Sequence, residues 1–165
     1  MSRIGTTTNL PTGSTYDLLL VQTPDGFPKS QITFQFSNVP RKIEGLQKVA
    51  QCFLKILFTT KGSDPLRQTH GTAFPYLVIS ANKQYNDREF EMSLMSAIID
   101  AESQTKAMLN GSKYDSASQL SKIVFLGVNS VAESLSLYLQ MVTVAGEQAS
   151  ISVPFPSLDL KLSNG

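Results

Sequence analysis

The hydrophobic pattern of this chain changes its period along the sequence, and that change limits the folds open to it. Between residues 43 and 101 apolar side chains recur every three or four positions, which is the spacing of amphipathic helices. Between residues 134 and 144 apolar and polar side chains alternate, which is the spacing of a half-buried strand. Because strands follow helices rather than alternate with them, the pattern argues against a doubly wound nucleotide-binding sheet. The sequence predicts an α+β fold.

The first of two long amphipathic helices is predicted just before residue 59. Pro40 can occupy its first turn, and the helix should end near Phe58. Lys48 and Gln51 fall on the side opposite the apolar stripe and are expected to face solvent. The stripe consists of Ile43, Leu46, Val49, Ala50, Phe53, Ile56 and Leu57.

The second long helix is predicted over about residues 87–110. Its apolar stripe is Phe90, Leu94, Ala97, Ile98 and Ala101. Three methionines, Met92, Met95 and Met108, lie on or near that stripe and are expected to pack in the core. The short apolar run at residues 76–79 favours a helix, with a strand as the alternative.

Strands are predicted at both ends of this helical region. Short N-terminal strands are expected within residues 16–36, after a flexible arm at residues 1–14. A C-terminal β-hairpin is expected in about residues 120–153, with a turn at Gly146. Two prolines should end it and leave residues 154–165 as a polar tail. All of this fits a single domain over residues 1–165.

Composition limits the partners of the chain. Charged residues make up 16% and the net charge is +1, against a usual charged fraction of about 25%. Such a chain has no long-range field to attract nucleic acid or an anionic membrane. No apolar run approaches the roughly 20 residues that span a bilayer, and the N-terminus lacks the apolar core of a signal peptide. We expect no nucleic acid or membrane partner, a cytoplasmic location, and an uncharged polar surface that suits a subunit of an assembly.

Residues 59–75, TTKGSDPLRQTHGTAFP, are the first place to look for chemistry. The Lys61-Gly62-Ser63 run only superficially resembles a phosphate loop, which needs a Gly-Lys-Ser/Thr end preceded by a strand. His70, the only histidine, has no nucleophile elbow near it and is interpreted as a loop residue that makes hydrogen bonds. The segment is predicted to connect two helices, with Thr72 as the N-cap of the second and Pro75 in its first turn.

Acidic residues at positions 89, 91, 100 and 102 allow a glycosidase hypothesis. Glu91 and Asp100 lie nine residues apart, which is about 13 Å along a helix, against about 5 Å in a retaining pair. A solvated helix face explains these carboxylates without a further assumption and is preferred to the glycosidase hypothesis. Cys52, the single cysteine, excludes an internal disulfide and a cysteine-cluster metal site. We expect a non-enzymatic protein without cofactor or metal.

Residues 45–75, GLQKVAQCFLKILFTTKGSDPLRQTHGTAFP, resemble the contractile-tail phage baseplate wedge subunit that initiates the sheath, a family once described as lysozyme-like. In that family an amphipathic helix ends in Leu/Phe-Thr, a polar turn with a glycine follows, and a second glycine precedes the next helix. Here these features fall at residues 57–60, 61–65 and 71–74. The predicted helix and hairpin after them come in the family's order.

The resemblance implies a structural subunit of the baseplate in the virion tail, assembled in the host cytoplasm and present in multiple copies in a symmetric assembly. It implies other baseplate wedge proteins and the tail sheath as partners, with the tail tube as a further candidate. Members of the family pair a terminal β-element with the first sheath ring, and an edge strand offers unpaired N–H and C=O groups for this. The expected interface residues are Thr59, Thr60, Lys61, Gly62, Ser63, Asp64, Pro65, Gly71, Leu135, Leu137, Leu139, Met141, Ile151 and Val153.

Two other functions stay open at this point. One is another tail protein, such as a tube–baseplate adaptor. The other, less favoured, is a cell-wall hydrolase that acts through Glu89 or Asp100. For the favoured function, deletion of residues 146–165 is expected to leave the helices folded and to stop sheath assembly.

Overall fold

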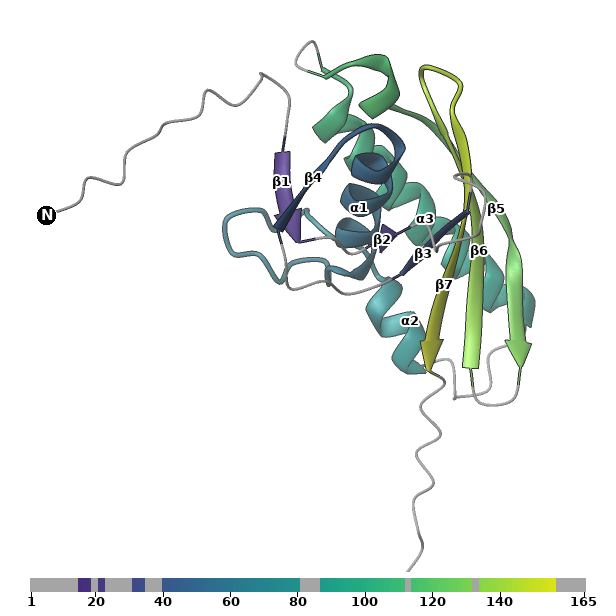
Figure 1. Cartoon of the computed structure of the whole chain (residues 1–165). Coiled ribbons are helices and arrows are strands. Elements are labelled where there is room, and N and C mark those ends of the chain that lie inside the picture. Colours follow the sequence, from purple (N-terminus) through teal and green to yellow (C-terminus); the bar gives the residue numbers. More distant parts are fainter. Residues whose placement is uncertain are drawn as a thin grey trace, which may run out of the picture.

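The computed structural model describes residues 15–18, 21–22, 31–34, 40–80, 87–111, 114–131 and 134–156, with side chains at residues 43–79, 88–111, 114–128 and 136–153. Helices occupy residues 45–109 of this described part, and a three-stranded antiparallel sheet follows them (Figure 1). The predicted α+β class is therefore confirmed.

Helix α1, Gly45–Phe58, ends where the sequence predicted but begins later. Pro40 lies in strand β4, Pro40–Ile43, so its predicted place in the first helical turn is wrong. The chain stays extended through Glu44 and turns into the helix at Gly45, whose φ is 55°. The amide of Gly45 donates to Ser118 Oγ at 3.0 Å, which fixes the start of the helix against a distant segment.

Helix α1 is buried on more than its apolar stripe. Lys48 is 5% exposed and Gln51 1%, so the expectation that both face solvent is wrong. The amine of Lys48 lies 3.9 Å from the centre of the Tyr114 ring, a cation–π contact that offsets part of the cost of burial. Burial lowers the pKa of Lys48. Covered on several sides, α1 forms the centre of the fold.

Two more helices surround α1. Helix α2, Phe74–Ser80, confirms the helical interpretation of residues 76–79, and α3, Asp87–Leu109, confirms the second long helix. A short 3₁₀ helix, η1 at Ser116–Ser118, leads into the sheet. The helices share one main core with the sheet, and a second small cluster consists of Val49, Leu109 and Leu120. The largest fully buried side chains of both clusters are Phe53, Phe74, Leu54, Ile56, Leu57, Leu94, Leu120, Leu137, Leu139, Met141 and Ile151.

The C-terminal sheet has three antiparallel strands where a hairpin was predicted. They are β5, Leu120–Val131, β6, Ser134–Thr143, and β7, Gln148–Pro156. Strand β6 lies between the other two and pairs with both. Its alternating side chains face the helices on one side, which is why this strand carries the clearest period of two.

Strand β7 runs through the two prolines that were expected to end it. Pro154 pairs with Ser136 and Pro156 with Ser134, so the predicted polar tail begins too early at residue 154. A proline is tolerated in a strand where its missing N–H would point away from the partner strand. On its other side, β7 pairs only through residues 150–152.

The backbone ahead of α1 is assigned to four short strands, β1 Thr15–Leu18, β2 Val21–Gln22, β3 Gln31–Phe34 and β4. Strand β1 pairs with β4, and β3 runs parallel to β7 with β2 beside it. Whether the side chains of these N-terminal strands pack in the core is not tested, because the side chains before Ile43 lie outside the described part. The arm at residues 1–14 lies outside it as well.

Candidate functional site

The connector between α1 and α2 closes on itself. The amide of Thr72 donates to the carbonyl of Thr59 at 2.8 Å, and the amide of Lys61 donates to the carbonyl of Thr72 at 3.0 Å. These bonds bring the two ends of the loop side by side, as a parallel bridge between Thr60 and Thr72. We call residues 59–72 the connector loop.

Thr72 joins the end of one helix to the start of the next. Its buried hydroxyl donates to the carbonyl of Leu57 at 2.8 Å and accepts from the amide of Phe74, the first residue of α2, at 3.1 Å. The side chain therefore satisfies a free amide at the start of α2, as the sequence predicted for a cap. Pro75 follows in the first turn, where it lacks an N–H that would have no partner anyway.

Helix α3 holds the other end of the connector loop. The side-chain amide of Gln104 accepts from the amide of Gly71 at 3.0 Å and donates to its carbonyl at 2.9 Å. Gly71 has a φ of 94°, and a Cβ at this position would collide with the carbonyl oxygen of Thr59. A surface ion pair between Lys61 Nζ and Asp100 Oδ2, at 3.5 Å, adds a second tie. Only glycine fits at position 71.

The exposed tip of the connector loop is a turn built around Asp64. One carboxylate oxygen accepts from the amide of Leu66 at 2.9 Å, and the other accepts from Arg67 Nε at 3.0 Å. The hydrogen bond from Leu66, together with Arg67, lowers the pKa of Asp64. Leu66 itself is 93% exposed. The turn thus presents a large apolar side chain to solvent on a hydrogen-bonded backbone.

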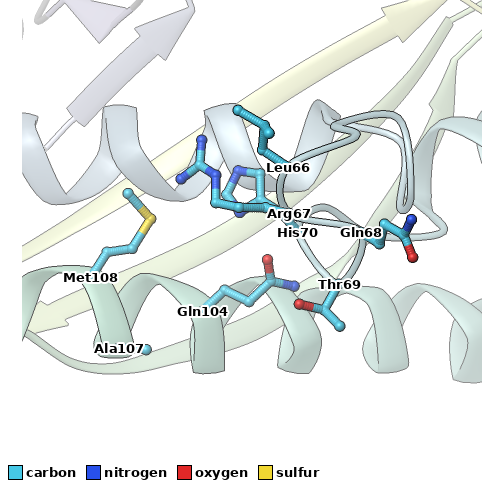
Figure 2. Close-up of a pocket in the computed structure, with 8 residues that line it drawn as sticks. All are labelled: Leu66, Arg67, Gln68, Thr69, His70, Gln104, Ala107 and Met108. Carbon is cyan, nitrogen blue, oxygen red and sulfur yellow. The ribbon is translucent and has the colours of Figure 1, made fainter.

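A pocket of about 410 Å³ lies between this tip and the last turns of α3. Figure 2 shows the side chains of Arg67 and His70 next to each other, with Met108 facing them from α3. None of the residues that line the pocket is acidic. They are Leu66, Arg67, Gln68, Thr69, His70, Gln104, Ala107 and Met108.

Two of the three amides in the Lys61-Gly62-Ser63 run are bonded within the connector loop. The amide of Lys61 is taken by Thr72 and that of Ser63 by the carbonyl of Thr60, at 3.1 Å. A phosphate loop needs such amides free to point at the anion. The amide of His70 donates to the carbonyl of Arg67 at 2.8 Å, in keeping with the interpretation of His70 as a hydrogen-bonding loop residue.

The acidic residues of α3 lie on its surface. Asp100 pairs with Lys61, and Glu102 pairs with Lys106 at 2.7 Å. Glu89 and Glu91 are exposed in the first turns of the helix. Within the described ranges, no three residues among His, Cys, Asp and Glu are arranged to hold a metal ion.

The predicted interface residues of the sheet are placed in the core. Leu137, Leu139, Met141, Ile151 and Val153 are at most 1% exposed, and the side chain of Leu135 lies outside the described part. Strand β6 pairs on both sides, so it offers no edge, and the expectation of an edge there is wrong. The reason is that β5 joins the predicted hairpin as a third strand.

The predicted interface residues of the connector loop are mostly at the surface. Lys61, Gly62, Ser63 and Pro65 are exposed, and Thr59, Thr60 and Asp64 are half-buried. Gly71 is buried under α3, so it can only support an interface. The structure therefore keeps the loop as a candidate surface without Gly71.

Among the strands that the structure describes, the sheet ends at the two-residue strand β2 on one side and at the longer strand β5 on the other. Strand β5 pairs only with β6, and its register shifts between Leu120 and Lys122 and again between Phe125 and Gly127. Leu126, at the second shift, is 56% exposed. Three half-buried side chains of this strand, Ile123, Phe125 and Val128, pack against the core cluster.

Sequence reasoning also missed an apolar stripe on α3. Met92, Met95 and Ile99 are 64%, 45% and 60% exposed, so the expectation that these methionines pack in the core is wrong. Met108 is likewise 48% exposed. The spacing of three and four residues between Met92, Met95 and Ile99 was visible in the sequence and places them on one face of the helix.

Comparison with known proteins gives no relative: no protein-family model matches the chain, and no curated protein sequence does. No helix in the described residues has both the length and the apolar character to cross a membrane.

Proposed function

We propose that this chain is a structural subunit of a contractile phage tail, in the baseplate wedge, and that it initiates the sheath by pairing a β-strand with a partner. The single observation that carries the proposal is the outer edge of β5, which has a neighbouring strand on one side only among the described strands. The resemblance of residues 45–75 to the sheath-initiating wedge subunits supplies the identity of the assembly.

The edge of β5 has properties that favour strand addition. An unpaired strand edge leaves N–H and C=O groups that a partner strand can complete. On the core side, Ile123, Phe125 and Val128 are only half-buried, so an added strand would cover apolar surface as well as form hydrogen bonds. The exposed Leu126 would be covered by the same partner.

One feature restricts where the partner strand can pair. The register shifts at residues 121 and 126 divide β5 into two regular stretches. Because bulges interrupt pairing, the partner strand is expected to follow one stretch rather than the whole strand. The stretch at residues 122–125 carries Lys122, whose charge weakens it as a pairing site. The stretch from Gly127 onward has no such charge up to Val131.

The test introduces a charge at the edge and counts sheathed tails. Leu126→Lys is exposed and should leave the fold intact, while a lysine at an edge opposes strand addition. Val144→Lys, equally exposed in the turn between β6 and β7, is the matched control. Electron microscopy of tails assembled with Leu126→Lys should show baseplates without sheath, and Val144→Lys should give normal tails.

Normal sheathed tails from the Leu126→Lys variant would overturn the strand-pairing mechanism. A ring of this subunit around the tube, away from the sheath, would instead support a tube–baseplate adaptor. The purified protein should release no peptidoglycan fragments, and turnover that Asp100→Asn abolishes would support a hydrolase.

A further inference from the structure

We propose that the pocket beside the connector loop binds residues 157–162 of a second copy of this chain, with Asp159 at Arg67 and its flanking leucines against Leu66 and Met108. This inference is independent of the β5 edge. It concerns contacts between copies of the subunit, whereas the proposed function concerns the sheath.

The charge of the pocket selects an acidic occupant. Arg67 and His70 are its only ionisable lining residues, and no carboxylate lines it. Arg67 uses its Nε–H for Asp64, which orients the guanidinium, and a guanidinium has four further N–H donors. The side chain is 61% exposed, so these donors are accessible from the pocket side. Arginine in this arrangement suits a carboxylate better than a neutral group.

The apolar rim of the pocket selects bulky aliphatic neighbours of that carboxylate. Leu66 is 93% exposed and Met108 48%, on opposite sides of the pocket. The amide of Leu66 is held by Asp64, so its backbone is already ordered before any partner binds. An acidic residue with an apolar side chain on each side therefore matches both parts of the pocket (Figure 2).

Only one stretch of the chain outside the described residues has this pattern. Acidic residues occur there at positions 25, 133 and 159. Asp25 lies between proline and glycine, and Glu133 between alanine and serine. Asp159 lies between Leu158 and Leu160, and Leu162 follows after one residue. The sequence thus supplies one carboxylate between two leucines. Because Lys161 makes the net charge of residues 157–162 zero, the match depends on the placement of Asp159 and its leucines and not on the net charge of the segment.

Distance disfavours the pocket of the same copy. The side chain of Asn110 bonds both backbone groups of Leu120, so α3 ends where β5 begins. The pairing of β5, β6 and β7 places Pro156 at the opposite end of the sheet, roughly 30 Å away along the ten residues of β6. Gln104 lies at most about 9 Å back along α3. Asp159 reaches about 11 Å beyond Pro156 only if the chain reverses direction there and is fully extended. The pocket of a second copy requires no such path.

A contact of this kind is heterologous, because the segment and the pocket are different surfaces of the same chain. Repeated from copy to copy, it closes into a ring or extends as a filament. A ring is the arrangement that a subunit present in several copies around a tail would need.

The first test measures self-association of the full chain by sedimentation velocity between about 10 µM and 1 mM. The wild type should associate as its concentration rises, and Asp159→Asn and Arg67→Gln should each weaken association at least tenfold. Asp25→Asn and Lys122→Gln remove the same charges elsewhere and should associate as the wild type does. Thermal unfolding by circular dichroism checks that each variant is folded.

The second test exchanges the charges between copies. Arg67→Glu and Asp159→Lys should each fail to associate alone, and a mixture of the two should associate, because the pocket of one then fits the segment of the other. A labelled peptide with the sequence SLDLKLS should bind the wild-type chain. The same peptide should not bind the Arg67→Gln variant. A wild type that stays monomeric to 1 mM, or an Asp159→Asn variant that associates like the wild type, overturns the proposal.

Discussion

The connector loop and the outer edge of the sheet are both candidate surfaces, but they are built in opposite ways. The connector loop uses its backbone internally: Thr59, Lys61 and Thr72 bond one another, and Gln104 takes both groups of Gly71. Strand β5 has a partner on one side only in the described sheet. The loop can therefore offer shape and side chains, whereas the edge can also offer hydrogen bonds. The side chains that the tip of the loop presents to solvent include Leu66 and Arg67.

The largest effect is expected from removing β7. Deletion from residue 146 takes away Ala149, Ile151 and Val153, all at most 1% exposed, so the structure predicts that the helices unfold as well, where the sequence led us to expect that they stay folded. The loss of the buried Ile151 and Val153 side chains and of the strand that pairs with one side of β6 is comparable with the stability of about 5–15 kcal/mol that a domain has. Circular dichroism should show an unfolded chain. Truncation after Pro156, which keeps β7, should remain folded, and a folded chain ending at residue 145 would show that the sheet and helices are separable.

The next largest effect is expected at Gly71, the point where the connector loop is most tightly closed. Gly71→Ala places a Cβ against the carbonyl of Thr59 at a φ of 94° and should cost about 3 kcal/mol in urea unfolding. Gly62→Ala is the matched control, because its φ is 81° but the nearest atom to an added Cβ is 3.8 Å away. It should cost only about 1 kcal/mol. Equal losses would mean that backbone strain alone, and not the contact with Thr59, makes glycine necessary at position 71.

A smaller effect is expected at Gln104, which ties the loop to α3. Gln104→Ala leaves the amide and carbonyl of the buried Gly71 without the partners that Gln104 provides and should cost about 2 kcal/mol. Gln68→Ala removes the same side chain from an exposed position of the connector loop and should cost less than about 0.5 kcal/mol. Hydrogen exchange at Gly71 should accelerate in the first variant alone. Unchanged exchange there would mean that the loop closes without help from α3.

The sequence located the helices and strands more accurately than it predicted which segments pack against each of them. The periods of 3.6 and 2 located α1, α3 and β6, because each element buries one face and the period follows the backbone geometry. A period does not say which element covers a face. Lys48 is buried on the second side of α1, where Tyr114 lies against its amine, and Gln51 is buried as well. The sequence of α1 alone does not indicate this second covered side.

The same reason explains why β6 was predicted to be an edge strand, although it lies between two other strands. Leu137 and Leu139 alternate as they would in an edge strand with one buried face, and they alternate equally in a central strand. The number of strands beside β6 depends on whether residues 120–131 pair with it, which is a long-range choice. The cap at Thr72 was predictable because a cap depends only on residues within a few positions.

The smallest effect is expected from Asp64, which organises the exposed tip of the connector loop. The amide of Leu66 and then Arg67 lower the pKa of its carboxyl below the ordinary value of 3.8. A lowered folded-state pKa stabilises the fold fully above the unfolded pKa and loses that contribution as pH falls through the folded value. Urea midpoints measured from pH 6 to pH 2.5 should therefore fall slightly less steeply for Asp64→Asn than for the wild type. Glu91→Gln, an exposed carboxyl on α3, should follow the wild type. If Asp64→Asn also follows it, the turn at the tip keeps its shape without the charge, and Leu66 owes its exposed position to the closed base of the loop alone.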